Sequence, residues 1–155
     1  MSEYPVMVPE WLAPWVLNDY NPLDLWWRAH WHTQCIEGPI YFLLLCWVCR
    51  RWWIPLPLAL FVNLVTHPLL WYYFPWFEPD PSYLAPLVPA GMDPVYITWL
   101  VIAESCVVAI EGLLVALAIM RWGKEGCRAP APALFYGFAV AFVANVPSTL
   151  AGLFL

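Results

Sequence analysis

Residues 94–122 read PVYITWLVIAESCVVAIEGLLVALAIMRW, and the only charged residues in this stretch are Glu104, Glu111 and Arg121. A helix that crosses the hydrocarbon core of a bilayer needs about 20 predominantly apolar residues. The stretch is longer than that and ends in a basic residue. We therefore predict a transmembrane helix here, and this helix sets the expectation for the rest of the chain.

The composition of the whole chain agrees with that prediction. The 155 residues are 63% hydrophobic and 11% charged, whereas a soluble domain is nearer half apolar and about a quarter charged. The 12 Trp and 8 Tyr suit the two membrane interfaces, where an amphipathic ring lies half in water. A net charge of −5 argues against nucleic acid as a partner, because nucleic acid requires a basic patch.

Four apolar segments predict an all-α, polytopic membrane protein with four transmembrane helices. The first segment is the weakest, because polar residues interrupt its N-terminal half and its uninterrupted apolar run, residues 40–48, is too short to span alone. Acidic residues, Pro and Trp are frequent in residues 1–24, which we interpret as an N-terminal interfacial arm before one transmembrane domain, residues 25–155. The expected helices are residues 25–53, 54–77, 94–122 and 131–155.

Charge predicts how the helices are oriented. Five of the six Lys and Arg residues lie in two loops, residues 50–55 and 121–130, whereas loop 78–93 is acidic and rich in Pro. Cytoplasmic loops carry an excess of Lys and Arg. We therefore expect the two basic loops on the cytoplasmic side of the cell (inner) membrane, with both termini and loop 78–93, as an irregular cap, on the outer side.

The first two segments resemble the last two. Glu37-Gly38 corresponds to Glu111-Gly112, and in the second helix of each pair Asn and a hydroxyl residue recur at the same spacing, in FVNLVTHPL (61–69) and VANVPSTLA (143–151). Two hairpins with the same orientation imply a pseudo-two-fold axis along the membrane normal. Chance similarity between apolar helices is the alternative interpretation.

Polar residues from all four segments fall at a similar predicted depth. At a rise of about 1.5 Å per residue, Asn63 and Glu111 lie about 14–15 Å from the inner edge, and Glu37 and Asn145 roughly 18–20 Å from it. A carboxylate at the centre of a bilayer costs about 2.5–3.5 kcal/mol. These side chains should therefore face the bundle interior, a cavity or a partner.

This layer gives the candidate residues for binding a ligand or cation, or for passing protons. They are Glu37, Asn63, Thr66, His67, Glu104, Glu111, Asn145 and Ser148. The alternative is that they only join helices, because interhelical hydrogen bonds in membranes contribute about 0.6 kcal/mol each. His67, which precedes a Pro, could likewise bond a backbone carbonyl that the Pro leaves free.

Three of these residues, His67, Glu104 and Glu111, are candidate ligands for a divalent cation, because carboxylate and imidazole suit several divalent metals. Their spacing matches no known ligand motif. Cys46 and Cys49 form a CxxC inside an apolar run, where buried cysteine is an ordinary small hydrophobic residue. No catalytic residue is assigned. An intramembrane enzyme would use His67 as its base, with Ser148 at a compatible depth.

The pattern resembles a loosely defined set of small bacterial four-helix membrane proteins with no assigned activity. The residues that carry the resemblance are Glu37-Gly38-Pro39, Asn63 to Pro68, the paired Glu104 and Glu111, and Asn145 to Ser148. The resemblance implies the four-helix plan for residues 36–155 and no activity.

Our leading interpretation is a non-enzymatic subunit of a larger membrane assembly, or a self-associating bundle, with the lipid bilayer and other membrane subunits as partners. The alternatives are a proton or metal-cation carrier that acts as an oligomer, and the intramembrane enzyme.

Overall fold

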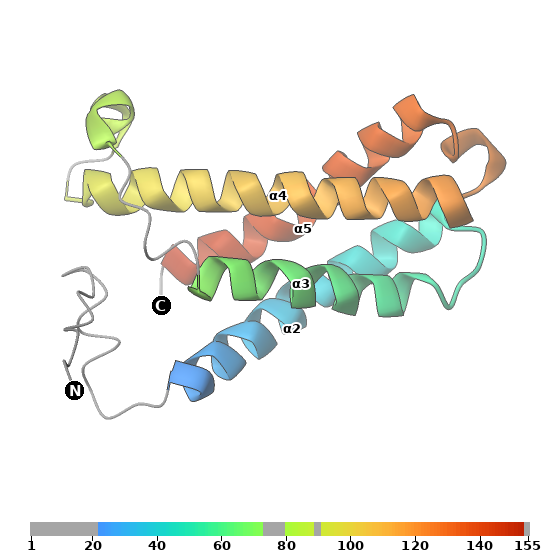
Figure 1. The fold of residues 1–155 in the computed structure, drawn as a ribbon, viewed down its shortest axis with the longest axis horizontal. Helices are drawn as coiled ribbons and strands as arrows, with labels where there is room; N and C mark the ends of the chain where they lie inside the picture. The colour runs from blue at the N-terminus through green and yellow to red at the C-terminus, as the bar shows by residue number, and fades with distance from the viewer. Residues whose placement is uncertain (1–21, 73–79, 89–90, 154–155) are drawn as a thin grey trace, which may run out of the picture.

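The computed structural model describes residues 22–72, 80–88 and 91–153, and it confirms an all-helical chain. Four long helices are present (Figure 1), and they are α2 (Pro22–Val48), α3 (Pro55–Tyr72), α4 (Pro94–Trp122) and α5 (Pro130–Leu153). Three short 3-10 helices lie between them, η2 (Pro81–Tyr83), η3 (Ala85–Leu87) and η4 (Glu125–Cys127). The first 21 residues of the predicted interfacial arm lie outside the described residues, and its last three belong to α2.

Each long helix begins at a proline. The ring fixes φ near the helical value, and the missing N–H would have no partner in the first turn. Asp93 also caps α4, because its side chain accepts a hydrogen bond from the Val95 N–H at 2.9 Å. The first helix was expected to reach residue 53, which was wrong, since α2 ends at Val48. The expected end of the second helix, residue 77, lies outside the described residues.

The four helices form two hairpins that point the same way, as the internal repeat predicts. Figure 1 shows the α2–α3 and α4–α5 turns at one end of the bundle, and the starts of α2 and α4 at the other. The main packing contacts run around a ring, from α2 to α3, α4, α5 and back to α2. Corresponding helices of the two hairpins therefore lie diagonally opposite each other.

An antiparallel backbone bridge joins the two hairpins at the end where they turn. It pairs Cys49, just after α2, with Gly123, just after α4. The Arg50 N–H donates to the Trp122 carbonyl at 3.0 Å, and the Lys124 N–H donates to the Val48 carbonyl at 2.9 Å. Cys49 and Gly123 are as far apart in the sequence as Glu37 and Glu111. The bridge therefore joins two positions that correspond in the internal repeat.

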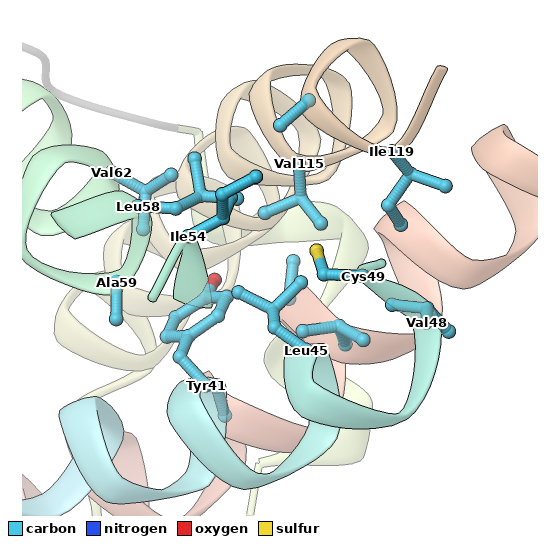
Figure 2. Packing of buried hydrophobic residues seen from close by; sticks show 14 of the residues in the cluster. Tyr41, Leu45, Val48, Cys49, Ile54, Leu58, Ala59, Val62, Val115 and Ile119 are labelled. Carbon is cyan, nitrogen blue, oxygen red and sulfur yellow. The ribbon is translucent and has the colours of Figure 1, made fainter. Parts of the chain in front are cut away.

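A hydrophobic core fills the half of the bundle next to these turns (Figure 2). Positions that correspond in the two hairpins are buried alike: Leu45 and Ile119 are both fully buried, as are Val62 and Ala144. We call this cluster the apolar plug. Its members are Tyr41, Leu45, Val48, Cys49, Ile54, Leu58, Ala59, Val62, Val115, Ala118, Ile119, Ala133, Val140, Ala141 and Ala144.

Helices α4 and α5 approach backbone to backbone at Gly137. A Cβ atom added there would lie 2.4 Å from the Gly112 carbonyl oxygen and 2.8 Å from the Ala116 nitrogen. Both distances are far below van der Waals contact, so only glycine fits without a backbone shift. This close approach sets the spacing of the second hairpin.

Two helices, α4 and α5, are long and apolar enough to cross a membrane, by length and composition. Polar residues interrupt α2, and α3 contains three prolines with Asn63 and His67, so both are less continuously apolar than α4 and α5. Large apolar side chains cover much of the outer surface, including Trp47, Leu117 and Phe135. The four-span topology stays a prediction.

Candidate functional site

A cavity of about 520 Å³ occupies the half of the bundle away from the apolar plug. Its walls come from the N-terminal halves of α2 and α4 and the C-terminal halves of α3 and α5. All eight residues predicted from the sequence line it, namely Glu37, Asn63, Thr66, His67, Glu104, Glu111, Asn145 and Ser148. The polar side chains of the four helices are thus gathered around one space.

Glu111 of α4 lies at the floor of this cavity and is 1% exposed. Its Oε1 accepts a hydrogen bond from Thr66 Oγ1 at 2.6 Å. Its Oε2 accepts from the Tyr41 hydroxyl at 2.5 Å and from Asn145 Nδ2 at 2.6 Å. The three donors belong to α3, α2 and α5, so this carboxyl group connects all four helices.

Glu37 of α2 is the counterpart of Glu111 in the first hairpin and is 2% exposed. It accepts a hydrogen bond from the Ser148 hydroxyl of α5. Each hairpin therefore supplies a Glu from its first helix and a hydroxyl from its second, and each hydroxyl bonds the Glu of the other hairpin. The two hydrogen bonds, Thr66 to Glu111 and Ser148 to Glu37, therefore correspond to each other in the internal repeat.

Asn63 and Asn145 correspond in the repeat but differ in their bonding. Asn145 Nδ2 donates to Glu111 and to the Ala141 carbonyl, the latter at 2.9 Å. Asn63 is 1% exposed, yet neither its side-chain nitrogen nor its oxygen has a hydrogen-bond partner. Leaving a buried polar group unpaired costs about 1–3 kcal/mol, and such groups commonly mark a place for a water or an ion. Asn63 therefore offers a donor and an acceptor to a guest in the cavity.

Aromatic and imidazole rings form one wall of the cavity. The His67 ring stacks on Trp71, with 6.4 Å between ring centroids, and meets His30 edge-on at 5.0 Å. His30 in turn stacks on Trp26 at 5.2 Å. His67 Nε2 lies 3.2 Å from Thr33 Oγ1 on α2. His67 thus bonds a side chain on a neighbouring helix, and its Nδ1 has no hydrogen-bond partner among the described residues, which contradicts the expectation of a carbonyl freed by its own proline.

The remaining polar groups of the wall lie nearer the open end of the bundle. Glu104 lies on α4 two turns before Glu111, and Thr149 follows Ser148 on α5. Arg28 and His32 of α2 also line the cavity and are exposed. The cavity therefore runs from a carboxylate-rich floor to a mouth that carries one arginine.

The residues proposed as metal ligands do not form a metal site. Among the described residues there is no group of three or more His, Cys, Asp or Glu side chains placed to hold a metal ion, so His67, Glu104 and Glu111 are not gathered as ligands. The serine hydrolase geometry is absent as well. His67 lies beside Thr33, whereas Ser148 bonds Glu37 and the Asn145 carbonyl.

Cys46 and Cys49 form no disulfide with each other, and Cys49 belongs to the apolar plug. This agrees with their interpretation as ordinary residues of an apolar run.

Sequence reasoning missed Tyr41. Its hydroxyl is a donor to Glu111, and its ring is the largest fully buried side chain of the apolar plug. A signal was available, because Tyr41 follows Glu37 by four residues and so lies on the same face of α2. Thr33 and Thr149 were missed for a different reason, since their hydroxyls matter only once the neighbouring helices are placed.

No protein-family model matches this chain, and no curated protein or solved structure matches it. The resemblance to small bacterial membrane proteins therefore stays an interpretation of the short motifs.

Proposed function

We propose that this chain is a small integral membrane protein that binds a cation in an acidic cavity enclosed by its four helices. One observation carries the proposal: Glu37, Glu104 and Glu111 line a single cavity, together with the unpartnered amide of Asn63. Carboxylates inside a membrane-embedded bundle are costly unless a cation pairs with them. A positively charged guest offsets that cost and gives the Asn63 side-chain oxygen a partner.

The proposal of a membrane location rests on the apolar outer surface and on the charge distribution. Arg50, Arg51 and Lys124 lie at the end of the bundle with the turns, and the positive-inside rule places that end in the cytoplasm. The cavity then lies toward the outer face, and the apolar plug separates it from the cytoplasm. We propose that the cation enters from the outer side.

The dimensions of the cavity favour an organic ammonium ion or a hydrated ion over a bare metal ion. A volume of about 520 Å³ greatly exceeds the roughly 30 Å³ that one water molecule occupies in the liquid. The rings of Trp71 and Tyr96 line the same space. Aromatic faces attract ammonium groups by cation–π interaction, so this wall complements the carboxylates at the floor.

Two other functions stay predictions. Assembly with further membrane subunits is a prediction from the sequence. Carriage of a cation across the membrane needs a second opening, and the apolar plug fills the other half of the bundle in this structure. Binding from one side is therefore the function that the geometry favours.

A binding experiment on the full chain in mild detergent tests the proposal. Tetramethylammonium chloride and sodium chloride serve as probes, and intrinsic Trp fluorescence and the thermal unfolding temperature report binding. We expect saturable binding of at least one probe, and we expect Glu104→Gln to weaken it at least about ten-fold, equivalent to about 1.4 kcal/mol.

Glu125→Gln is the matched control for that experiment, because it removes one carboxylate from an exposed site in η4, outside the cavity. Binding to this variant should equal binding to the wild type. Failure of both probes to bind, or equal weakening by the two substitutions, contradicts the proposed cation site.

A further inference from the structure

Each of the two hydroxyls that bond the carboxyl groups has a second acceptor. Thr66 Oγ1 lies 2.6 Å from Glu111 Oε1 and 3.0 Å from the Val62 carbonyl oxygen of its own helix. Ser148 Oγ lies beside Glu37 Oε1 and 2.9 Å from the Asn145 carbonyl oxygen of its own helix. A hydroxyl has one hydrogen, so it donates to one of its two neighbours at a time.

This double placement has a chemical consequence. When the hydroxyl turns its hydrogen to the carbonyl, its oxygen faces the carboxyl group and can accept a hydrogen bond. The carboxyl group must then supply the hydrogen, and it is protonated. Each Glu can therefore gain or lose a proton while the hydrogen bond between it and the hydroxyl is kept, with only the direction of the bond reversed.

The two carboxyl groups differ in their remaining donors. Glu111 accepts two further hydrogen bonds, from Tyr41 and Asn145. Donors of this kind favour the ionised carboxylate. Glu37 has no counterpart of the Tyr41 donor, because the corresponding residue of the second hairpin is Val115. The Asn63 amide lies beside Glu37 but forms no hydrogen bond of normal length with it, unlike Asn145 with Glu111. Negative charge is thus better stabilised on Glu111 than on Glu37.

The charged groups around Glu37 also disfavour a negative charge on it. Helix α4 presents Glu111 and Glu104, which both repel a negative charge on Glu37. The titratable group of α3 in the cavity is His67, and α2 itself contributes Tyr41, Arg28, His30 and His32. The residues of α5 at the cavity wall are Asn145, Ser148 and Thr149, none of which titrates. Arg28 is exposed, so solvent screens its charge.

We propose that Glu37 exchanges a proton for the cation, with Ser148 reversing its hydrogen bond, while Glu111 stays ionised. In the empty cavity the Glu37 carboxyl donates to Ser148 Oγ, and Ser148 donates to the Asn145 carbonyl. On entry of the cation, the Glu37 O–H bond breaks and the proton leaves to water. Ser148 then turns its hydrogen to the new carboxylate. One positive charge enters and one leaves, so the net charge of the cavity is conserved. This inference rests on the proposed function.

Infrared spectroscopy of the full chain in detergent tests the protonation itself. Exposed carboxyl groups are ionised at neutral pH, so a protonated-carboxyl C=O band at that pH reports buried acids. Glu104 is a second half-buried acid in the cavity, so the comparison is made in a Glu104→Gln background. There we expect such a band, and we expect its complete loss when Glu37→Gln is added. Glu125→Gln should leave the band unchanged. Absence of the band in the Glu104→Gln protein, or its survival when Glu37→Gln is added, overturns the inference.

Ser148→Ala provides a second variant that keeps the acid. It removes the hydroxyl to which the protonated Glu37 donates, so the C=O band should remain but shift in frequency. An unshifted band shows that Ser148 is not the partner and overturns that part of the proposal. This variant also separates a changed hydrogen bond from a misfolded protein, because Glu37 itself is unaltered.

Addition of whichever probe binds, tetramethylammonium or sodium, separates failure of the inference from failure of the proposed function. Saturation with that cation should abolish the band and release about one proton per cation, measured by calorimetry in buffers of different ionisation enthalpy. Binding without loss of the band overturns proton exchange and leaves the cation site standing. If neither probe binds while Glu37→Gln still removes the band, the protonation of Glu37 is supported. The proposed cation site is then contradicted, and so is proton exchange for these cations.

Discussion

Replacement of Glu111 by Leu is expected to destabilise the protein by about 1–3 kcal/mol, the cost of leaving a buried hydrogen-bond donor without an acceptor. Three donors bond this carboxyl group. The donors are Tyr41, Thr66 and Asn145. Thr66 and Asn145 keep a carbonyl acceptor on their own helices, whereas the Tyr41 hydroxyl has no second acceptor among the described residues. The loss should therefore fall mainly on Tyr41. Unfolding by a denaturing detergent, followed by circular dichroism, measures the change in free energy.

A double-mutant cycle assigns that loss to the hydrogen bond. Tyr41→Phe alone removes a bond to a charged group, for which about 1.5–3 kcal/mol is expected. In the Glu111→Leu background the same substitution should cost less than about 0.5 kcal/mol, because the hydroxyl no longer has its acceptor and its removal relieves an unpaired group. Additive costs for the two substitutions contradict the assigned contact.

Gly137→Ala is expected to lower the free energy of unfolding by about 1–3 kcal/mol or more, the usual cost of forcing extra atoms into a packed interior. The added methyl group would meet backbone atoms of Gly112 and Ala116, which cannot turn away as a side chain does. Helices α4 and α5 must therefore separate. Thermal unfolding and a cysteine cross-linking distance between the two helices measure both consequences.

Gly126→Ala is the matched control, because it adds the same methyl group in η4, outside the contact between α4 and α5. No atom lies within 4 Å of the added methyl there. This variant should therefore be about as stable as the wild type. Equal destabilisation of the two variants contradicts the close approach at Gly137.

Much of the helical plan could be predicted from the sequence. The stretch from Pro94 to Trp122 was predicted with the bounds that the structure shows, because hydropathy, a proline start and a basic end all agree there. The end of α2 could not be placed in the same way. Trp52 and Trp53 belong to the turn and are exposed. Because their rings are apolar, the sequence pattern predicts that the helix continues through them.

The members of the candidate site were predictable, but their pairings were not. Helical spacing and predicted depth selected eight residues, and all eight line one cavity in the structure. The repeat alone would assign equal bonding to Asn63 and Asn145, yet only Asn145 forms a close hydrogen bond to a carboxyl group. That difference depends on the exact separation of the helices, which the sequence does not encode locally. Tyr41 was overlooked because an aromatic ring in an apolar run counts as hydrophobic, although its hydroxyl is a strong donor.

The bridge between Cys49 and Gly123 limits how the two hairpins can move relative to each other. The two hairpins are fastened by backbone hydrogen bonds at one end. Any relative rotation of the hairpins must pivot near that joint, so atoms close to it move little and atoms at the far end move most. Movement of the carboxyl groups on entry of a guest would therefore change the far end of the bundle more than the end with the bridge.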